Sequence, residues 1–183
     1  DHEVNIKIAL NMAVAKGQVS EKKRDQLLLS MTDDVAVMVL KNNYQQSRLI
    51  GQCALHSITH MDLFVNFIAF HVKNGNLNRE LECLPSEEAM LERKSAGEGL
   101  ARPEISVLVA YSKNLLTDAL RESTLIAQPF FADTVLNAFP AQMHDPFREC
   151  IRGHRLFREI VSTQLSNLVV SEMGPTFVYQ MQD

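Results

Sequence analysis

The chain has few cysteines and no motif built from them. Its 183 residues include three, Cys53, Cys83 and Cys150, which lie far apart and form no C-x-x-C pair. A disulfide framework needs an even and denser set of cysteines. The cysteine count therefore argues against a disulfide-stapled secreted domain, and we expect a cytoplasmic protein.

Long hydrophobic runs and an excess of basic charge are also absent. The longest apolar stretches, 35–40 and 67–70, are far shorter than the roughly 20 residues that a membrane-spanning helix needs. The first ten residues are charged and contain no apolar run of signal-peptide length. A net charge of −4 gives no electrostatic reason to bind nucleic acid or an anionic membrane. We expect neither partner.

The sequence also lacks the common catalytic and nucleotide-binding motifs. It contains no G-x-G-x-x-G after a strand, no Walker loop and no G-x-S-x-G. No two acidic residues lie in a clearly apolar context. We therefore assign no catalytic, cofactor-binding or metal-binding residue to this chain.

Helical periodicity fills the segments between glycines and prolines. With 46% hydrophobic and 22% charged residues, the composition is that of an ordinary globular domain. No segment alternates with period two, so we predict no strand. The sequence predicts one all-α domain over residues 1–183, a multi-helix, bundle-like fold with short loops and no sheet.

Capping and breaking residues place the helices. Val4, Ile8 and Met12 mark the apolar face of a first helix that Gly17 ends. Ser20 and the Thr32–Asp34 segment are typical helix starts. The expected helices cover 20–30, 32–55, 59–74, a short piece at 78–84, 85–96, a helix from Pro103, 129–139, and 145–173 as the longest.

The stretch GEGLARPEISVLVAYSKNLL (97–116) raises a choice between chemistry and structure. Tyr111 and Lys113 are two residues apart, so on a helix they point to different faces and cannot form an acid–base pair. Glu104 lies in the first turn, where the helix dipole favours an acid. We interpret Tyr111 as a packed ring with a satisfied hydroxyl and Lys113 as a solvated chain end.

Histidines supply the other candidates. His56 and His60 have metal-ligand spacing, but the pair lacks a third ligand, and loop or surface histidines are the simpler interpretation. His154 lies on an apolar stripe of the expected helix 145–173, one turn after Cys150. We interpret it as a hydrogen-bonded core residue, with a catalytic or interface role as the alternative. Arg148, Arg152 and Arg155 form a face that we expect to be solvated or ion-paired.

The amide-rich run from Asn42 to Gln46 stands out because it carries no charge in mid-helix. We hypothesise that these amides pair with a neighbouring helix or another domain. An ordinary solvated face is the alternative.

Six stretches together carry a family resemblance. Taken in chain order they are DHEVNIKIAL, MTDDVAVMVLKNNYQQ, NRELECLPS, GEGLARPEISVLVAYSK, HRLFREIVSTQLSNLVV and GPTFVYQM. In this order they resemble the C-terminal part of the large bacterial NAD-specific glutamate dehydrogenases. Relatives tend to carry Thr or Ser where Ala101 stands, so the capping box with Glu104 is reduced to its acidic half.

The resemblance implies a parent enzyme that converts L-glutamate, NAD and water to 2-oxoglutarate, ammonia and NADH, in the cytoplasm and as a homo-oligomer. It places the catalytic lysine, the catalytic aspartate and the NAD-binding glycines upstream, with the catalytic core ending before Asp1. The chain is then a fragment without its own NAD site, inactive alone, with a structural, assembly or regulatory role. Residues 1–30 would pack on the upstream catalytic core; Asp1, His2 and Glu3 would lie near the active site, without an assigned role.

Two alternatives come from other classes of protein. One is a free-standing helical adaptor that binds partner helices. The other is a helical metalloenzyme that uses His56, His60 and His154.

Overall fold

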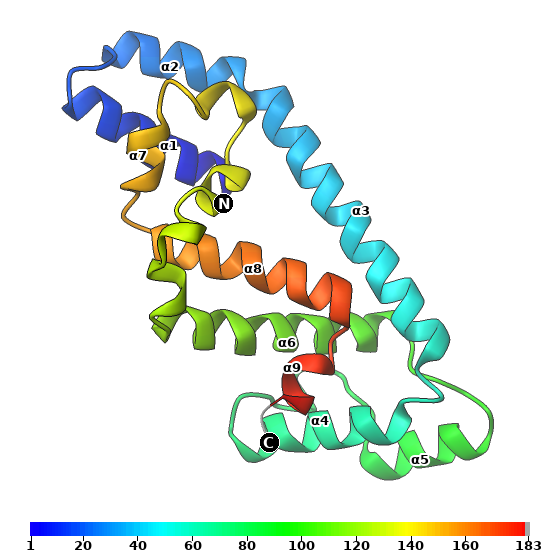
Figure 1. The fold of residues 1–183 in the computed structure, drawn as a ribbon. Coiled ribbons are helices and arrows are strands. Elements are labelled where there is room, and N and C mark those ends of the chain that lie inside the picture. The colour runs from blue at the N-terminus through cyan, green and yellow to red at the C-terminus, as the bar shows by residue number, and fades with distance from the viewer. Residues whose placement is uncertain (182–183) are drawn as a thin grey trace. The chain divides into compact units, whose positions relative to one another are not determined.

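The computed structural model describes residues 1–181, and every regular element in that range is helical (Figure 1). This confirms the all-α prediction. The α-helices are α1 (His2–Ala15), α2 (Glu21–Ser30), α3 (Thr32–His56), α4 (Met61–Lys73), α5 (Glu87–Ser95), α6 (Arg102–Glu122), α7 (Arg148–Arg152), α8 (Phe157–Met173) and α9 (Phe177–Gln180). Short 3-10 helices are η1 (Leu125–Ala127), η2 (Pro129–Phe131), η3 (Thr134–Ala138) and η4 (Ala141–Met143).

The chain divides into two compact units, and the expectation that 1–183 forms one domain stays a prediction. Unit 1 comprises Asp1–Asn43 and Thr117–Leu165, and unit 2 comprises Tyr44–Leu116 together with the chain from Ser166 onward. Each unit has its own hydrophobic core. The boundaries fall inside α3, α6 and α8, so these helices contribute residues to both units.

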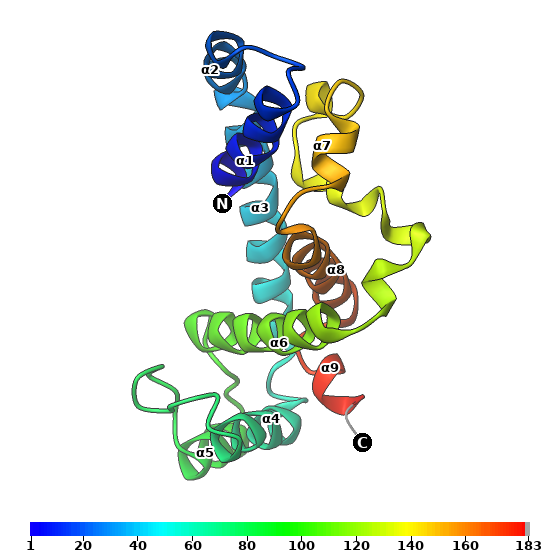
Figure 2. The same cartoon turned by 90° about the vertical axis from the view of Figure 1, so that its left-hand side faces the viewer.

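In unit 1, α1 supplies the centre of the core and packs beside α2 and α7 (Figure 2). Its buried face consists of Ile6, Ala9, Leu10 and Ala13, which follow i, i+3, i+4 and i+7 spacing. Our predicted face was wrong, because Val4 on that face is 59% exposed. The true face lies about half a turn away and is built partly of alanines, which a search for large apolar residues overlooks.

The predicted cap at Ser20 is confirmed, and Ser86 caps a second short helix in the same way. The Ser20 hydroxyl accepts a hydrogen bond from the Lys23 backbone N–H at the start of α2. The Ser86 hydroxyl does the same for Ala89 at the start of α5. Each cap satisfies a backbone donor that the first helical turn leaves unpaired.

The predicted long helix 145–173 is wrong, because it is broken into α7 and α8. The His154 side chain provides the reason: its Nδ1 accepts the Leu156 backbone N–H at 3.0 Å, which diverts that donor from a helical bond. The longest helix is instead α3, with 25 residues.

Two smaller predictions were also wrong. Residues 79–83 form turns, since the Asn78 side-chain oxygen accepts the backbone N–H groups of Glu80 and Leu81. The segment 129–139 contains the 3-10 helices η2 and η3 instead of one α-helix. Asparagine and proline in these short segments favour local turns over a continuous helix.

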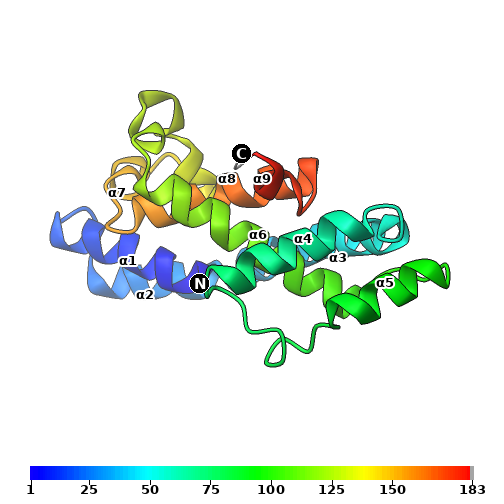
Figure 3. The ribbon, with the colours of Figure 1, turned by 90° about the horizontal axis from the view of Figure 1, so that it is seen from below.

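In unit 2, α4 buries Phe64, Phe67 and Ile68 and lies alongside α5 (Figure 3). Helix α6 adds Ile105 and Leu108 to the same core. Ala119, near the other end of α6, is exposed and belongs to unit 1.

A close backbone contact in unit 2 explains the GEGLARPE stretch. The buried Ser57 hydroxyl donates to the Ala54 carbonyl and accepts the Leu100 backbone N–H at 2.8 Å. A Cβ atom at Gly99 would lie 2.3 Å from Ser57 Oγ, so only glycine fits here. Just beyond, Glu104 accepts the Ala101 N–H at 2.7 Å, as expected for the acidic half of a capping box.

His154 is a hydrogen-bonded core residue of unit 1, as we interpreted it. It is 3% exposed, and its Nε2 lies 3.1 Å from the Asn5 carbonyl of α1. Because Nδ1 accepts from Leu156, Nε2 is the nitrogen that donates to Asn5. Burial is the largest effect on the ring and lowers the pKa of His154.

His71 is a second buried histidine that the sequence did not indicate. It is 1% exposed in the core of unit 2, and neither ring nitrogen has a hydrogen-bond partner among residues 1–181. Its ring lies 4.5 Å from that of Phe67, 5.2 Å from Phe70 and 5.6 Å from Tyr111, measured between centroids. Burial lowers the pKa of His71, since an apolar cage disfavours the charged ring.

No single helix in the described part of the chain is long and apolar enough to span a membrane. Helices α3 and α4 reach the required length and composition only when taken together across a sharp bend.

We predict opposite effects of alanine at two glycines of unit 2. Gly99→Ala should lower the free energy of unfolding by about 2–4 kcal/mol, because it displaces Ser57 and costs the bond to Leu100. Gly51→Ala is the control: its Cβ would meet only Arg102, at 3.8 Å. Because Gly51 lies in mid-helix, alanine there should raise the free energy of unfolding by about 0.5–1 kcal/mol. Urea denaturation measures both, and equal effects would contradict the contact at Gly99.

The buried histidines predict loss of stability in mild acid. The folded-state pKa of His71 lies below the ordinary 6.5, so the unfolded chain binds the proton more readily. The contribution of His71 is therefore constant above about pH 6.5 and falls below it, by up to about 1.4 kcal/mol per pH unit, until the lowered pKa is passed.

The matching measurement is urea denaturation between pH 5 and 8. His71→Leu should flatten the pH dependence, leaving the part due to His154. The control His60→Gln changes an exposed histidine and should leave it as in the wild type. An unchanged slope in His71→Leu would count against this explanation.

Candidate functional site

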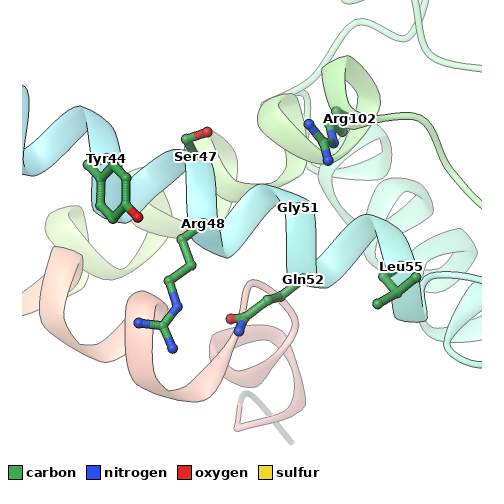
Figure 4. A pocket seen from close by; sticks show the side chains of 7 residues that line it. All are labelled: Tyr44, Ser47, Arg48, Gly51, Gln52, Leu55 and Arg102. Atoms are coloured by element: carbon green, nitrogen blue, oxygen red, sulfur yellow. The ribbon is translucent and has the colours of Figure 1, made fainter.

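A surface hollow in unit 2 is the main candidate for a binding site. It is an open depression of about 420 Å³ along the second half of α3 (Figure 4). The residues that line it are Tyr44, Ser47, Arg48, Gly51, Gln52, Leu55 and, from the start of α6, Arg102. Its volume is within the range of small-molecule sites, although it is shallow.

Helical spacing explains how α3 builds this hollow. Arg48 and Gln52 are four residues apart and therefore share one row of the helix surface. Ser47, Gly51 and Leu55 form the neighbouring row, with glycine as its low point. Figure 4 shows Arg48 and Gln52 pointing to one side of α3, while Arg102 stands on the other side beside Gly51.

The hollow is positively charged in a chain whose net charge is negative. Its described lining contains two guanidinium groups and no carboxylate. Within residues 1–181, neither Arg48 nor Arg102 forms a hydrogen bond or ion pair through its side chain. Arginine stays charged at any physiological pH. The lining can therefore bind an anion, but it contains no nucleophile–base pair.

Tyr111 and Lys113 do not form a site together. The Tyr111 hydroxyl donates to Glu82 at 2.7 Å, and this hydrogen bond, followed by burial, raises the pKa of Tyr111. The satisfied hydroxyl confirms its structural interpretation. Lys113 is half-buried, and burial lowers its pKa, so describing it as a solvated chain end was wrong.

The histidines of the hypothetical metal site have other contacts. His60 Nδ1 lies 3.1 Å from the His56 carbonyl and 3.0 Å from the Thr59 hydroxyl, while His154 is buried in unit 1. The described residues contain no group of three His, Cys, Asp or Glu side chains that could hold a metal ion.

The arginine face of unit 1 is ion-paired, as we expected. Arg148 and Arg152 both contact Asp133, at 3.3 and 2.7 Å, and Arg152 also contacts Glu149. The hydrogen bond to Asp133 raises the pKa of Arg152. Cys150 is buried and its sulfur lies 3.3 Å from the Gln18 side-chain oxygen, so Cys150 and His154 have separate hydrogen-bond partners.

The remaining candidate residues lie on the surface. Every residue from Asn42 to Gln46 is exposed, and their proposed pairing with another helix or domain stays a prediction. Asp1 and Glu3 are exposed, while His2 Nδ1 lies 3.3 Å from the Ala138 carbonyl.

The sequence analysis missed the hollow and His71. The only sequence signal for the hollow was Gly51 inside a long predicted helix. Glycine lowers helix stability there, which indicates a packing or functional role. His71 carried no signal, because the Tyr111 ring that helps to enclose it comes from a different helix, α6.

Comparison with known proteins relates both ends of the chain to glutamate dehydrogenases. Residues 97–183 match the family described as glutamate dehydrogenase, C-terminal. Residues 1–53 match the family described as bacterial NAD-glutamate dehydrogenase, catalytic domain. We expected the catalytic core to end before Asp1, whereas the matched catalytic domain extends through most of α3.

Three similar proteins, each named NAD-specific glutamate dehydrogenase, align with the whole chain. Identity is 42% for Pseudomonas aeruginosa, 40% for Halomonas elongata and 38% for Mycobacterium tuberculosis. The chain spans 11% of the length of each of them. Family matches over residues 1–53 and 97–183, and similarity along the whole of this chain, lead to one conclusion: the chain belongs, as a segment, to the family of large bacterial NAD-specific glutamate dehydrogenases.

Proposed function

We propose that this chain is a non-catalytic, helical part of an NAD-dependent glutamate dehydrogenase that supports assembly of the enzyme. The parent would oxidise L-glutamate with NAD and water to 2-oxoglutarate, ammonia and NADH. Its relatives carry that name, and the hollow in unit 2 offers anion-binding groups without a nucleophile–base pair. The NAD site belongs to the rest of the parent.

The exposed middle of α3 carries this proposal. From Ala36 to Arg48 every residue is exposed except the half-buried Met38. Val37 is 64% exposed and Leu40 67% exposed, three residues apart on one face. Most helices in proteins are stabilised because an apolar face packs against the rest of the fold. The apolar face of this segment is not packed in that way. An exposed apolar helix face of this kind marks a contact surface.

The rest of the catalytic domain is the partner that fits this surface. The catalytic-domain match continues to residue 53 and so includes the exposed segment of α3. The other residues of that domain lie outside this chain, which spans 11% of the relatives. Packing of α3 against the catalytic domain of the same polypeptide would cover Val37 and Leu40. We also propose a cytoplasmic, homo-oligomeric enzyme.

The direct test is NADH formation by the full-length protein with L-glutamate against other amino acids. A second protein that ends after Cys53, where the match to the catalytic domain ends, is compared with it. Glutamate-dependent reduction that is lost on truncation supports the assembly role. Full activity of the truncated enzyme would overturn that role, and a full-length protein inactive with glutamate would return us to the adaptor interpretation.

A substitution in α3 tests the contact surface. In the full-length protein, Val37→Ser with Leu40→Ser should lower the thermal midpoint by several degrees and reduce activity, because buried apolar contacts are lost. Leu81→Ser is the control, since Leu81 is 80% exposed and lies on a turn. Equal effects of the two changes, or none, would argue against packing at α3.

A substitution at Tyr111 tests whether helix α6 takes part in catalysis. Tyr111→Phe removes the hydroxyl that donates to Glu82 and should cost about 1 kcal/mol of stability. The kcat of the full-length enzyme for glutamate should stay within twofold of the wild type. A loss of a hundredfold or more, with an intact thermal midpoint, would instead make Tyr111 part of the catalytic machinery.

A further inference from the structure

We propose that the hollow around Gly51 binds a small molecule with two anionic groups, carboxylates or phosphates, at the two ends of a spacer that crosses the surface of α3 at Gly51. One anionic group faces Arg48 and the other faces Arg102. Tyr44, Ser47 and Arg48 of the hollow lie at the end of the exposed segment 36–48, but the assembly role is argued from Val37 and Leu40, and the binding proposal does not depend on it.

The charge of the hollow is the first observation. Each guanidinium offers several N–H donors in a fixed fork that matches a carboxylate or a phosphate. In unit 1, the guanidinium groups of Arg148 and Arg152 both form ion pairs with the Asp133 carboxylate. Arg48 and Arg102 have no such carboxylate within residues 1–181, although both line the same depression.

The position of the two arginines indicates two anionic groups. Arg48 projects to one side of α3 and Arg102 stands on the other, with Gly51 between them (Figure 4). A ligand that contacts both must cross the helix surface at Gly51. A single small anion can neutralise one arginine, whereas a molecule with two anionic ends can neutralise both.

Glycine at position 51 gives this ligand its space. Glycine in a helix interior costs about 0.5–1 kcal/mol relative to alanine. Nothing in the fold requires it here, since a Cβ would meet only Arg102 Nη2, at an ordinary 3.8 Å. A larger side chain would fill the low point between Ser47 and Leu55 and close the path across the helix.

The other lining residues fit such a ligand. Gln52 lies beside Arg48 and supplies amide donors, and Ser47 supplies a hydroxyl on the neighbouring row. The Leu55 side chain can contact the carbon atoms of a spacer. A metal cation is disfavoured by the two positive charges, and two arginines in a chain of net charge −4 are too few for nucleic acid.

The test measures binding to the 183-residue chain by isothermal titration calorimetry at low ionic strength. Suberate and hexane-1,6-diol bisphosphate are the two probes with an anionic group at each end, and acetate and phosphate are the single-group controls. Suberate or the bisphosphate should bind with a Kd below about 1 mM, at least tenfold tighter than its single-group control. Which of the two binds distinguishes a carboxylate from a phosphate ligand.

Variants locate the site. Arg48→Gln and Arg102→Gln should each weaken binding at least tenfold, because each removes one fork. Gly51→Leu should weaken it as much without changing the charge. Arg155→Gln is the matched control, since Arg155 is also exposed but lies in unit 1. Arg48, Arg102 and Arg155 are exposed and Gly51 is half-buried, and unchanged circular dichroism verifies folding of each variant.

Several outcomes would overturn the proposal: no binding of either dianion to the wild type, equal binding of the single-group controls, or equal weakening by Arg155→Gln. Because the readout is binding and not glutamate oxidation, these outcomes leave the proposed assembly role untouched. Loss of NADH formation on truncation, conversely, says nothing about this hollow.

Discussion

The contact between Ser57 and the backbone at Gly99 sets the geometry of unit 2. Ser57 follows the last residue of α3, and Leu100 lies two residues before the first residue of α6. The hydrogen bond from Leu100 to Ser57 therefore joins the end of one helix to the start of the other. It forms only because Gly99 has no side chain. Both walls of the hollow, α3 and Arg102, depend on this join.

Buried polar groups play two different roles in the two units. In unit 1, both ring nitrogens of His154 form hydrogen bonds to backbone groups, and the bond from the Leu156 N–H separates α7 from α8. In unit 2, His71 is enclosed by aromatic rings and donates to no described partner. The first arrangement determines the fold, whereas the second makes stability depend on pH.

The surface of α3 changes character along its length. Its middle exposes Val37 and Leu40, which suit contact with a larger body of protein. Its second half exposes Arg48 beside Gly51, and together with Arg102 of α6 this surface suits a small anion. The two surfaces can therefore have different occupants. A large enzyme of which this chain spans 11% would offer the first occupant within its own polypeptide.

The sequence could predict those features that depend on neighbouring residues. Ser20 and Ser86 cap their helices because capping needs a hydroxyl three residues before a donor. Glycine and proline predicted most ends, and the order of six stretches indicated the family. The break at His154 was not predicted: its bond to Leu156 is local, but the Asn5 carbonyl that holds the other ring nitrogen lies at the other end of the chain. The cage around His71 depends likewise on Tyr111.

The amino-acid sequence by itself determined that this protein is helical, where most helices begin, and to which family it belongs, since these follow from local spacing and residue order. Tertiary structure alone decided which helix faces are buried, which histidines are shielded from solvent, and which arginines have no carboxylate as an ion-pair partner in the described part of the chain. Those properties depend on what a side chain meets across the fold. Gly51 and Gly99 show the difference: the sequence presents two glycines, and only the packing around each reveals that one leaves a hollow and the other admits a backbone.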